Sequence, residues 1–133
     1  MGPGVHIFEW AQAAFAAFPE AVQDDFLAVM ALLHEDPTYD APDPVHHVQI
    51  EPLRGPAELR KLVHRLSKDD PGYRGLYLLH RGTAYFYRFR RRDPLTYRNL
   101  HRDIQRALAD IPELERQWAH SGTDGSQGQR LRP

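Results

Sequence analysis

The stretch YRGLYLLHRGTAYFYRFRR, residues 73 to 91, decides the fold of this chain. It holds two runs rich in aromatic and aliphatic residues, Tyr73 to His80 and Thr83 to Arg91, and only Arg81 and Gly82 separate them. Two such runs joined by two residues that include glycine are typical of a β-hairpin. The stretch therefore predicts two neighbouring antiparallel strands.

A two-residue turn also predicts the register of this hairpin. His80 is expected opposite Thr83, and counting back along both strands places Arg74 opposite Phe89. Arg74 and Arg91 then share one face of the sheet, largely exposed and within joint reach of one phosphate, while Arg88 and Arg90 point to the other face. A shift of one residue in the pairing would exchange the faces.

The N-terminal third predicts a short strand followed by a helical hairpin. Alternating residues between Val5 and Trp10 favour the strand, and the alanine-rich run from Ala11 to Phe18 favours a first helix. Pro19 stands where a second helix can begin. One apolar stripe at helical spacing marks the core side of that second helix: Val22, Phe26, Val29, Met30 and Leu33.

The remaining segments complete an α+β domain. Residues 34–44 are expected to form a loop and Val45 to Leu53 a strand, while residues 59–68 fit either a strand or a helix. An apolar stripe predicts a C-terminal helix: Leu100, Ile104, Ala107, Leu108 and Ile111. We expect a single domain over residues 1–120, with a small antiparallel sheet of about three or four strands, and a disordered tail over 121–133.

Composition limits the chemistry that is open to the chain. Its 133 residues suit one domain, and the absence of cysteine excludes disulfides, thiolate metal sites and cysteine nucleophiles. His46 and His47 are adjacent, so on a strand they would point to opposite faces and could not chelate one metal. No signal peptide or membrane-spanning segment is evident. We expect a soluble cytoplasmic protein with no metal or other cofactor.

Charge is distributed unevenly along the chain. Residues 1–53 contain nine acidic residues and no Lys or Arg, whereas residues 54–133 contain all 17 basic residues and the other nine acidic ones. Fifteen of the 17 are arginine, the side chain that binds phosphate in a bidentate manner and stacks on bases. This asymmetry indicates a charged partner, and the basic half favours nucleic acid.

The basic groups concentrate where the hairpin leads into the C-terminal helix. Cations interleaved with aromatic side chains suit the backbone and bases of a single strand. No serine nucleophile motif, glycine-rich phosphate loop or metal-ligand cluster is present. Any catalysis would therefore use arginines and a tyrosine, and the residues expected at this corner are Arg88, Arg90, Arg91, Arg92 and Tyr97. His101 follows Tyr97 by four residues on the proposed helix, where the two side chains could meet for proton transfer, although a lone surface histidine is the simpler interpretation.

The order of these segments resembles the RelE/ParE superfamily of bacterial toxins, including its HigB-like branch, over roughly residues 5–111. The resemblance is carried in sequence order by VHIFEW, by FPEAVQDDFLAVMALLHEDP, by LRGPAELRKL, by YRGLYLL and by YFYRFRRRDPLTYRNLHRDIQRAL. Such a resemblance implies a RelE-like fold and a cognate antitoxin protein as partner.

The resemblance also implies roles for individual residues. Arg74 would bind and polarise the scissile phosphate, Arg91 would stabilise it further, and Tyr97 would stack on or orient the nucleotide. Arg60 matches an arginine of the family's "E-L-R" pattern. The expected RNA contacts are Lys61, Arg65, Lys68, Arg88, Arg90, Arg92, Arg98 and His101. Fixed guanidinium groups stabilise the charge that develops when RNA is cleaved by its own 2′-hydroxyl.

Three functions stay open from the sequence. The first is an endoribonuclease toxin that cleaves mRNA on the ribosome, and the second is a ParE-like inhibitor of DNA gyrase without catalysis. The third is a RelE-like binding module without toxicity. The long 34–44 loop, the acidic N-terminal half and the extended C-terminus depart from the family and leave room for another target. The acidic half is a candidate surface for the antitoxin or for a second copy of the chain.

Overall fold

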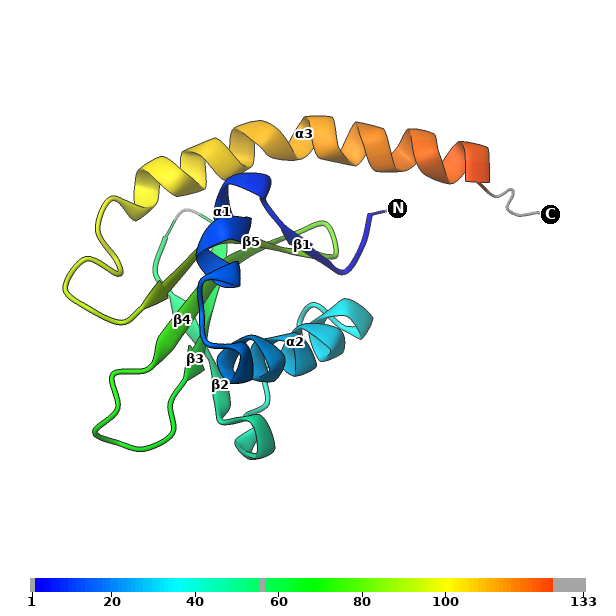
Figure 1. Cartoon of the computed structure of the whole chain (residues 1–133). Coiled ribbons are helices and arrows are strands. Elements are labelled where there is room, and N and C mark those ends of the chain that lie inside the picture. The colour runs from blue at the N-terminus through cyan, green and yellow to red at the C-terminus, as the bar shows by residue number, and fades with distance from the viewer. Residues whose placement is uncertain (1, 56, 126–133) are drawn as a thin grey trace.

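The computed structural model describes residues 2–55 and 57–125, and its helices and strands form an α+β fold (Figure 1). In chain order the elements are β1 (Val5–Ile7), α1 (Glu9–Ala16), α2 (Glu20–Glu35), the short 3₁₀ helix η1 (Pro44–His46), β2 (Val48–Leu53), β3 (Glu58–His64), β4 (Tyr73–His80), β5 (Thr83–Arg91) and α3 (Leu100–Gly125).

Five strands form one mixed sheet in the order β1-β5-β4-β3-β2. Strands β2, β3, β4 and β5 pair with one another in antiparallel fashion, while β1 pairs in parallel with β5. The α+β class is confirmed. The sheet has five strands and not the expected three or four, because the N-terminal strand β1 is itself an edge strand of the sheet, next to β5.

Helices α1 and α2 cover one face of the sheet, which we call the helical-hairpin face. The five residues of the predicted apolar stripe on α2 are all buried. Phe15 of α1 and Phe26 of α2 both pack against Phe89 of β5, with ring centroids 4.8 Å and 6.5 Å from it. The prediction that this stripe belongs to the core is confirmed.

Helix α3 packs along β5 against the opposite face, which we call the α3 face, and runs past the end of the sheet (Figure 1). Its residues Ile104, Ala107 and Ile111 are buried, and the Trp118 ring stacks on Tyr85 of β5. The helix continues to Gly125, so residues 121–125 are helical instead of forming the start of the expected tail. The rest of that tail lies outside the described residues.

The turn between β4 and β5 has the predicted form. Arg81 and Gly82 both have positive φ, 49° and 80°, as a type I′ hairpin turn requires. The register next to the turn is also as predicted, with His80 opposite Thr83 and Leu78 opposite Tyr85. The first half of the hairpin prediction is therefore confirmed.

Farther from the turn the predicted register is wrong. A β-bulge between Leu76 and Tyr77 shifts the pairing by one residue, because Tyr87 is an extra residue on β5. Arg74 consequently lies opposite Arg90, and Arg91 lies opposite Tyr73. Since one step of register exchanges the faces, Arg74 shares the α3 face with Arg88 and Arg90, and Arg91 points to the helical-hairpin face.

One further segment settles an alternative that the sequence left open, and another differs from its expected structure. Residues 58–64 form strand β3, which resolves the ambiguity of the 59–68 segment in favour of a strand because it pairs on both sides, with β2 and with β4. Strand β2 begins only at Val48, since Pro44–His46 turn into η1 and His47 adopts a left-handed backbone with φ of 60°.

Candidate nucleic-acid interface

A tyrosine, a lysine and an arginine meet on the α3 face. The phenol oxygen of Tyr97 accepts a hydrogen bond from Nζ of Lys61 at 2.9 Å and a second from Nε of Arg74 at 3.2 Å. Lys61 comes from β3, Arg74 from β4, and Tyr97 from the loop between β5 and α3. We call these three residues the phenol cluster.

The two bonds leave the phenol proton of Tyr97 available. A phenol oxygen offers two lone pairs and one O–H, and here the two cations occupy the acceptor side. The O–H of Tyr97 has no acceptor in the described part of the chain. It is therefore free to donate to a ligand.

Arg74 is a buried charge without a carboxylate partner. The residue is 3% exposed, whereas the sequence predicted a largely exposed side chain. Its Nη1 donates to the carbonyl oxygens of Pro71 and Tyr73, at 3.0 Å and 3.2 Å, and among the described residues it forms no ion pair. Buried charges are normally paired, so a cation held only by carbonyl and phenol dipoles marks a site for an anion.

The environment of Tyr97 sets the acidity of its phenol. Partial burial raises the pKa of Tyr97, but the hydrogen bonds from Lys61 and Arg74 and their positive charges outweigh burial and hold this pKa below its usual value. Lys61 also lies 3.6 Å from the carboxylate of Glu51, and its Nζ is 4.7 Å from the centre of the Tyr97 ring. The phenol is thus more acidic than an ordinary tyrosine.

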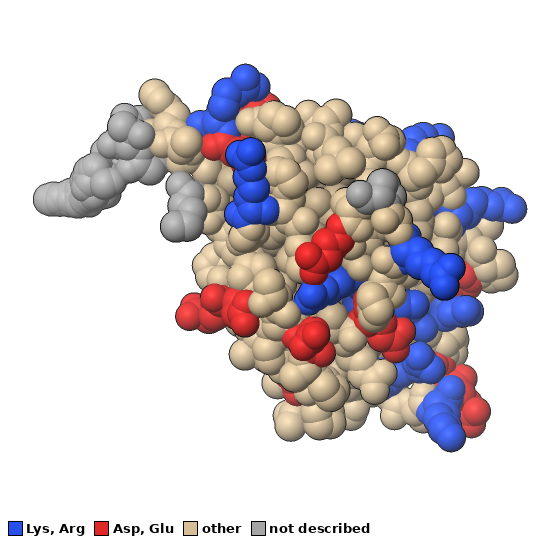
Figure 2. Space-filling model, turned by 180° about the vertical axis from the view of Figure 1, so that it is seen from behind, with Lys and Arg blue, Asp and Glu red and all other residues tan. Residues whose placement is uncertain are grey.

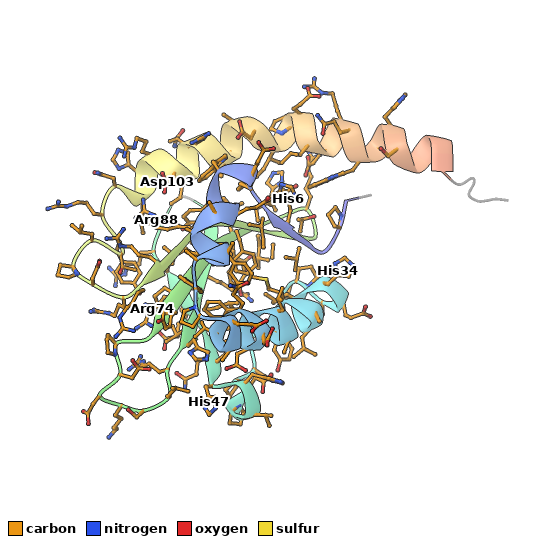
Figure 3. The ribbon with its side chains drawn as sticks, in the orientation of Figure 1. His6, His34, His47, Arg74, Arg88 and Asp103 are labelled. Carbon is orange, nitrogen blue, oxygen red and sulfur yellow. The ribbon has the colours of Figure 1, made fainter. Side chains whose placement is uncertain are left out.

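Arg88 fixes the loop that carries Tyr97. Its Nη2 and Nε donate to one carboxylate oxygen of Asp103 on α3, at 2.7 Å and 3.0 Å, and its Nη1 donates to the carbonyl oxygens of Thr96 and Arg98. In Figure 3 Arg88 and Asp103 lie next to each other where β5 meets the start of α3. Arg88 is therefore a positioning residue for the phenol cluster.

Two residues expected in the site lie on the wrong face for it. Arg91 packs on Tyr73, 5.4 Å from the ring centre, and donates to its hydroxyl. Arg60 donates to the carbonyl oxygen of Thr38 at 3.0 Å and to the carboxylate of Glu58 at 2.7 Å. Arg60 alternates with Lys61 along β3, so it points away from the α3 face. Neither residue belongs to the phenol cluster.

Most of the other expected basic residues line two hollows. One hollow of about 330 Å³ is lined by Arg74 together with Arg65, Lys68 and Arg92, and also by Asp69 and Asp70. Another of about 270 Å³ is lined by Arg88, Arg90, Arg98 and Arg102. Figure 2 shows Lys and Arg side chains gathered along one side of the molecule, over the loops that join β3 to β4 and β5 to α3. His101 is exposed in the first turn of α3.

His101 and Tyr97 do not share a helix. The sequence allowed them to lie four residues apart on one helix, but α3 starts at Leu100 after Asn99, whose φ is 57°. Tyr97 lies in the turn before the helix and bonds to β3 and β4 instead. His101 is an exposed residue of α3, in agreement with the simpler interpretation as a surface histidine.

Other kinds of site find no support in the described residues. Within residues 2–55 and 57–125 no group of three or more His, Asp or Glu side chains is arranged to hold a metal ion. No helix among them is long and apolar enough to cross a membrane.

Comparison with known proteins finds no family model, no curated protein and no solved structure that matches this chain significantly. The fold and the site define it as a small α+β protein with a cationic sheet face. The resemblance to RelE/ParE toxins rests on the sequence pattern alone.

Proposed function

We propose that this protein binds single-stranded RNA on the α3 face and cleaves it, as a RelE-like toxin that acts on mRNA at the ribosome. The observation that carries the proposal is the phenol cluster, in which the buried and unpaired guanidinium of Arg74 and the ammonium of Lys61 share one phenol oxygen. Two fixed cations can stabilise the charge that develops when a phosphodiester is cleaved, and an acidic phenol beside them can donate a proton.

The proposed reaction uses the 2′-hydroxyl of the RNA as nucleophile. Its oxygen attacks the adjacent phosphorus, the bond from phosphorus to the 5′ oxygen breaks, and the products carry a 2′,3′-cyclic phosphate and a 5′-hydroxyl. Arg74 and Lys61 stabilise the negative charge of the phosphorane. Tyr97 donates its proton to the departing 5′ oxygen, and water accepts the proton of the 2′-hydroxyl.

The surrounding cations are proposed to hold the strand on either side of the cleaved bond. Arg65, Lys68 and Arg92 line the hollow on one side of the cluster, and Arg98 and Arg102 line the hollow on the other. Each contact with a phosphate adds affinity by releasing counterions, so RNA binding should weaken steeply with salt. A cognate antitoxin would block this face, and the acidic N-terminal half is a second candidate surface for it or for another copy of the chain.

Expression in a bacterium without the antitoxin tests the biological part of the proposal. The intact chain should arrest growth, and Lys61→Ala, at the same level of folded protein, should not. If cells tolerate high levels of folded wild-type protein, the toxin proposal is contradicted and a binding module without toxicity is favoured.

A ParE-like inhibitor of DNA gyrase is the alternative from the sequence pattern. The two functions separate in purified systems, where the protein should cut mRNA on translating ribosomes and leave supercoiling by gyrase unchanged. Blocked supercoiling together with intact mRNA would favour the gyrase inhibitor.

A further inference from the structure

A third hollow, of about 430 Å³, is lined in part by Gln49 of β2 and Val63 of β3. Gln49 of β2 pairs with Val63 of β3, and Val63 pairs with Arg74 of β4, so these three side chains form one row across three strands. Neighbouring strands lie about 4.8 Å apart, which places Gln49 about 10 Å from Arg74 along the row. A nucleotide spans a distance of this order between its phosphate and the far edge of its base.

This hollow shares two lining residues, Arg65 and Lys68, with the hollow that Arg74 lines. A strand whose phosphate lies at Arg74 would pass these two cations before it reaches Gln49. Both cations are exposed, and neither forms an ion pair within the described residues. Their positive charge is therefore available to the sugar-phosphate backbone.

Apart from Arg65 and Lys68, the lining offers groups that suit a nucleobase. Pro42, Pro44 and Val63 contribute flat or aliphatic walls, while Gln49, His47 and Ser67 contribute polar side chains. A base is a flat, uncharged ring with donors and acceptors at its edge, and it is bound by stacking and by such side chains.

The polar side chains of the hollow are unused by the fold. In the described part of the chain, the amide of Gln49, the ring nitrogens of His47 and the hydroxyl of Ser67 form no hydrogen bond. Gln49 and Ser67 are exposed. These groups can bond to a base without breaking any contact of the protein.

The backbone around His47 is fixed before any ligand binds. The carboxylate of Asp43 accepts from the backbone N–H of His46 at 3.2 Å and contacts its Nδ1 at 2.8 Å, which closes η1. The backbone of Asp43 also pairs with Val48, and two prolines flank the turn. A site on a rigid turn loses little conformational entropy when it binds.

We infer that this hollow, the base subsite, binds one nucleobase of an RNA strand whose neighbouring phosphate lies at Arg74. The inference rests on the proposed function and adds to it the contacts that select a base. Gln49 is the specificity-determining residue, because its amide offers both a donor and an acceptor to the edge of the base. The segment from Pro42 to Gln49 thus reads sequence, while Arg65 and Lys68 bind the backbone.

Binding of 2′-O-methyl oligoribonucleotides to the full-length protein tests the inference, since these strands lack the attacking hydroxyl and stay intact. Fluorescence anisotropy would compare four homopolymers with an abasic strand of the same length. The wild type should prefer one base over the abasic strand. Gln49→Ala should lower the affinity for that base about 10-fold and leave the abasic strand unchanged, as expected for the loss of one good contact with a base.

Two further variants complete the comparison. Gln105→Ala removes the same amide from an exposed position on α3 and should change nothing. Arg65→Ala should weaken every strand alike, the abasic one included, and reduce the dependence on salt. Ser67→Ala should reduce the preference for one base in the same direction as Gln49→Ala.

The outcomes of this experiment distinguish the base subsite from the proposed function on which it rests. Equal affinity for all homopolymers and for the abasic strand would overturn the base subsite and leave RNA binding in place. A base preference that Gln49→Ala and Ser67→Ala both retain would also overturn it. Failure of the wild type to bind any strand at low salt would overturn both the subsite and the proposed function.

Discussion

The Nζ of Lys61 lies 2.9 Å from the phenol oxygen of Tyr97, although 36 residues separate the two in the sequence. This contact joins an inner strand of the sheet to the loop that leads into α3. It gives Tyr97 a cation on one side, and Arg74 supplies another. The acidity of Tyr97, and the reactivity proposed for it, depend on this arrangement.

The first prediction concerns the pH dependence of cleavage. If Tyr97 acts as the general acid, its phenol must be protonated, so the rate should fall as pH rises through the lowered pKa of Tyr97, below its usual value of about 10. Tyr97→Phe should lower the rate about 100-fold and abolish this alkaline decline. RNA binding should change little. The measurement is the rate of a single turnover against pH for both proteins.

The second prediction concerns the effect of Lys61 on the pKa of Tyr97. In Lys61→Met the hydrogen bond and the charge that lower the pKa of Tyr97 are lost, so the alkaline decline should move to higher pH. Lys61→Arg, which retains the charge, is the control and should move it less. A decline at the same pH in Lys61→Met and the wild type would assign it to another group.

The third prediction follows from the β-bulge. Arg91 lies on the helical-hairpin face against Tyr73, so Arg91→Ala should leave the cleavage rate within about twofold of the wild type, as expected for an ordinary surface position. Arg74→Lys keeps a positive charge but loses the planar guanidinium that reaches Tyr97 and two carbonyl groups, and should be strongly impaired. Equal loss of activity in the two variants would contradict this prediction and would support the register expected from the sequence, in which Arg74 and Arg91 share one face.

The sequence predicted the half of this hairpin next to its turn and not the other half. Two residues with glycine dictate a tight turn, and the pairs beside it follow by counting. The bulge at Tyr87 left no signal, because the alternation of aromatic and basic residues from Tyr85 to Arg91 fits either register. That one residue decides which arginines accompany Arg74, so the faces of the site could not be predicted.

The sequence predicted that each residue of the phenol cluster has a functional role, but it did not predict that the three side chains meet. Lys61, Arg74 and Tyr97 were all expected to contact RNA or to act in catalysis. Their contacts depend on the path of the loop over residues 92–99 and on the extension of β3 through Lys61, which periodicity left ambiguous. The ion pair of Arg88 with Asp103, and the base subsite around Gln49, depend likewise on contacts between segments far apart in sequence.

The fourth prediction concerns the anchor of the Tyr97 loop. The guanidinium of Arg88 is mostly buried and bonds to Asp103 and to two carbonyl groups. Arg88→Met should lower the free energy of unfolding by about 1.5 to 3 kcal/mol, the range for hydrogen bonds to a charged group. Urea unfolding measures the change, and Arg102→Met, at an exposed position on α3, is the control.

A double-mutant cycle tests whether this cost arises from the pair. Arg88→Met and Asp103→Leu should each destabilise the protein, and the double variant should cost clearly less than the two changes added together. Additive costs would mean that Arg88 stabilises the loop only through the carbonyl oxygens of Thr96 and Arg98.

The most direct test of the central claim is the chemistry of the ends of cut RNA. Purified protein would be added to ribosomes that translate a defined mRNA, and the fragments would be analysed for their termini. We expect the wild type to give fragments with a 5′-hydroxyl and a 2′,3′-cyclic phosphate. We expect Lys61→Ala to cleave at a rate about 100- to 1,000-fold lower, because one fixed donor to the charged transition state is lost. Intact mRNA with folded wild-type protein, or equal cleavage by Lys61→Ala, would contradict the central claim.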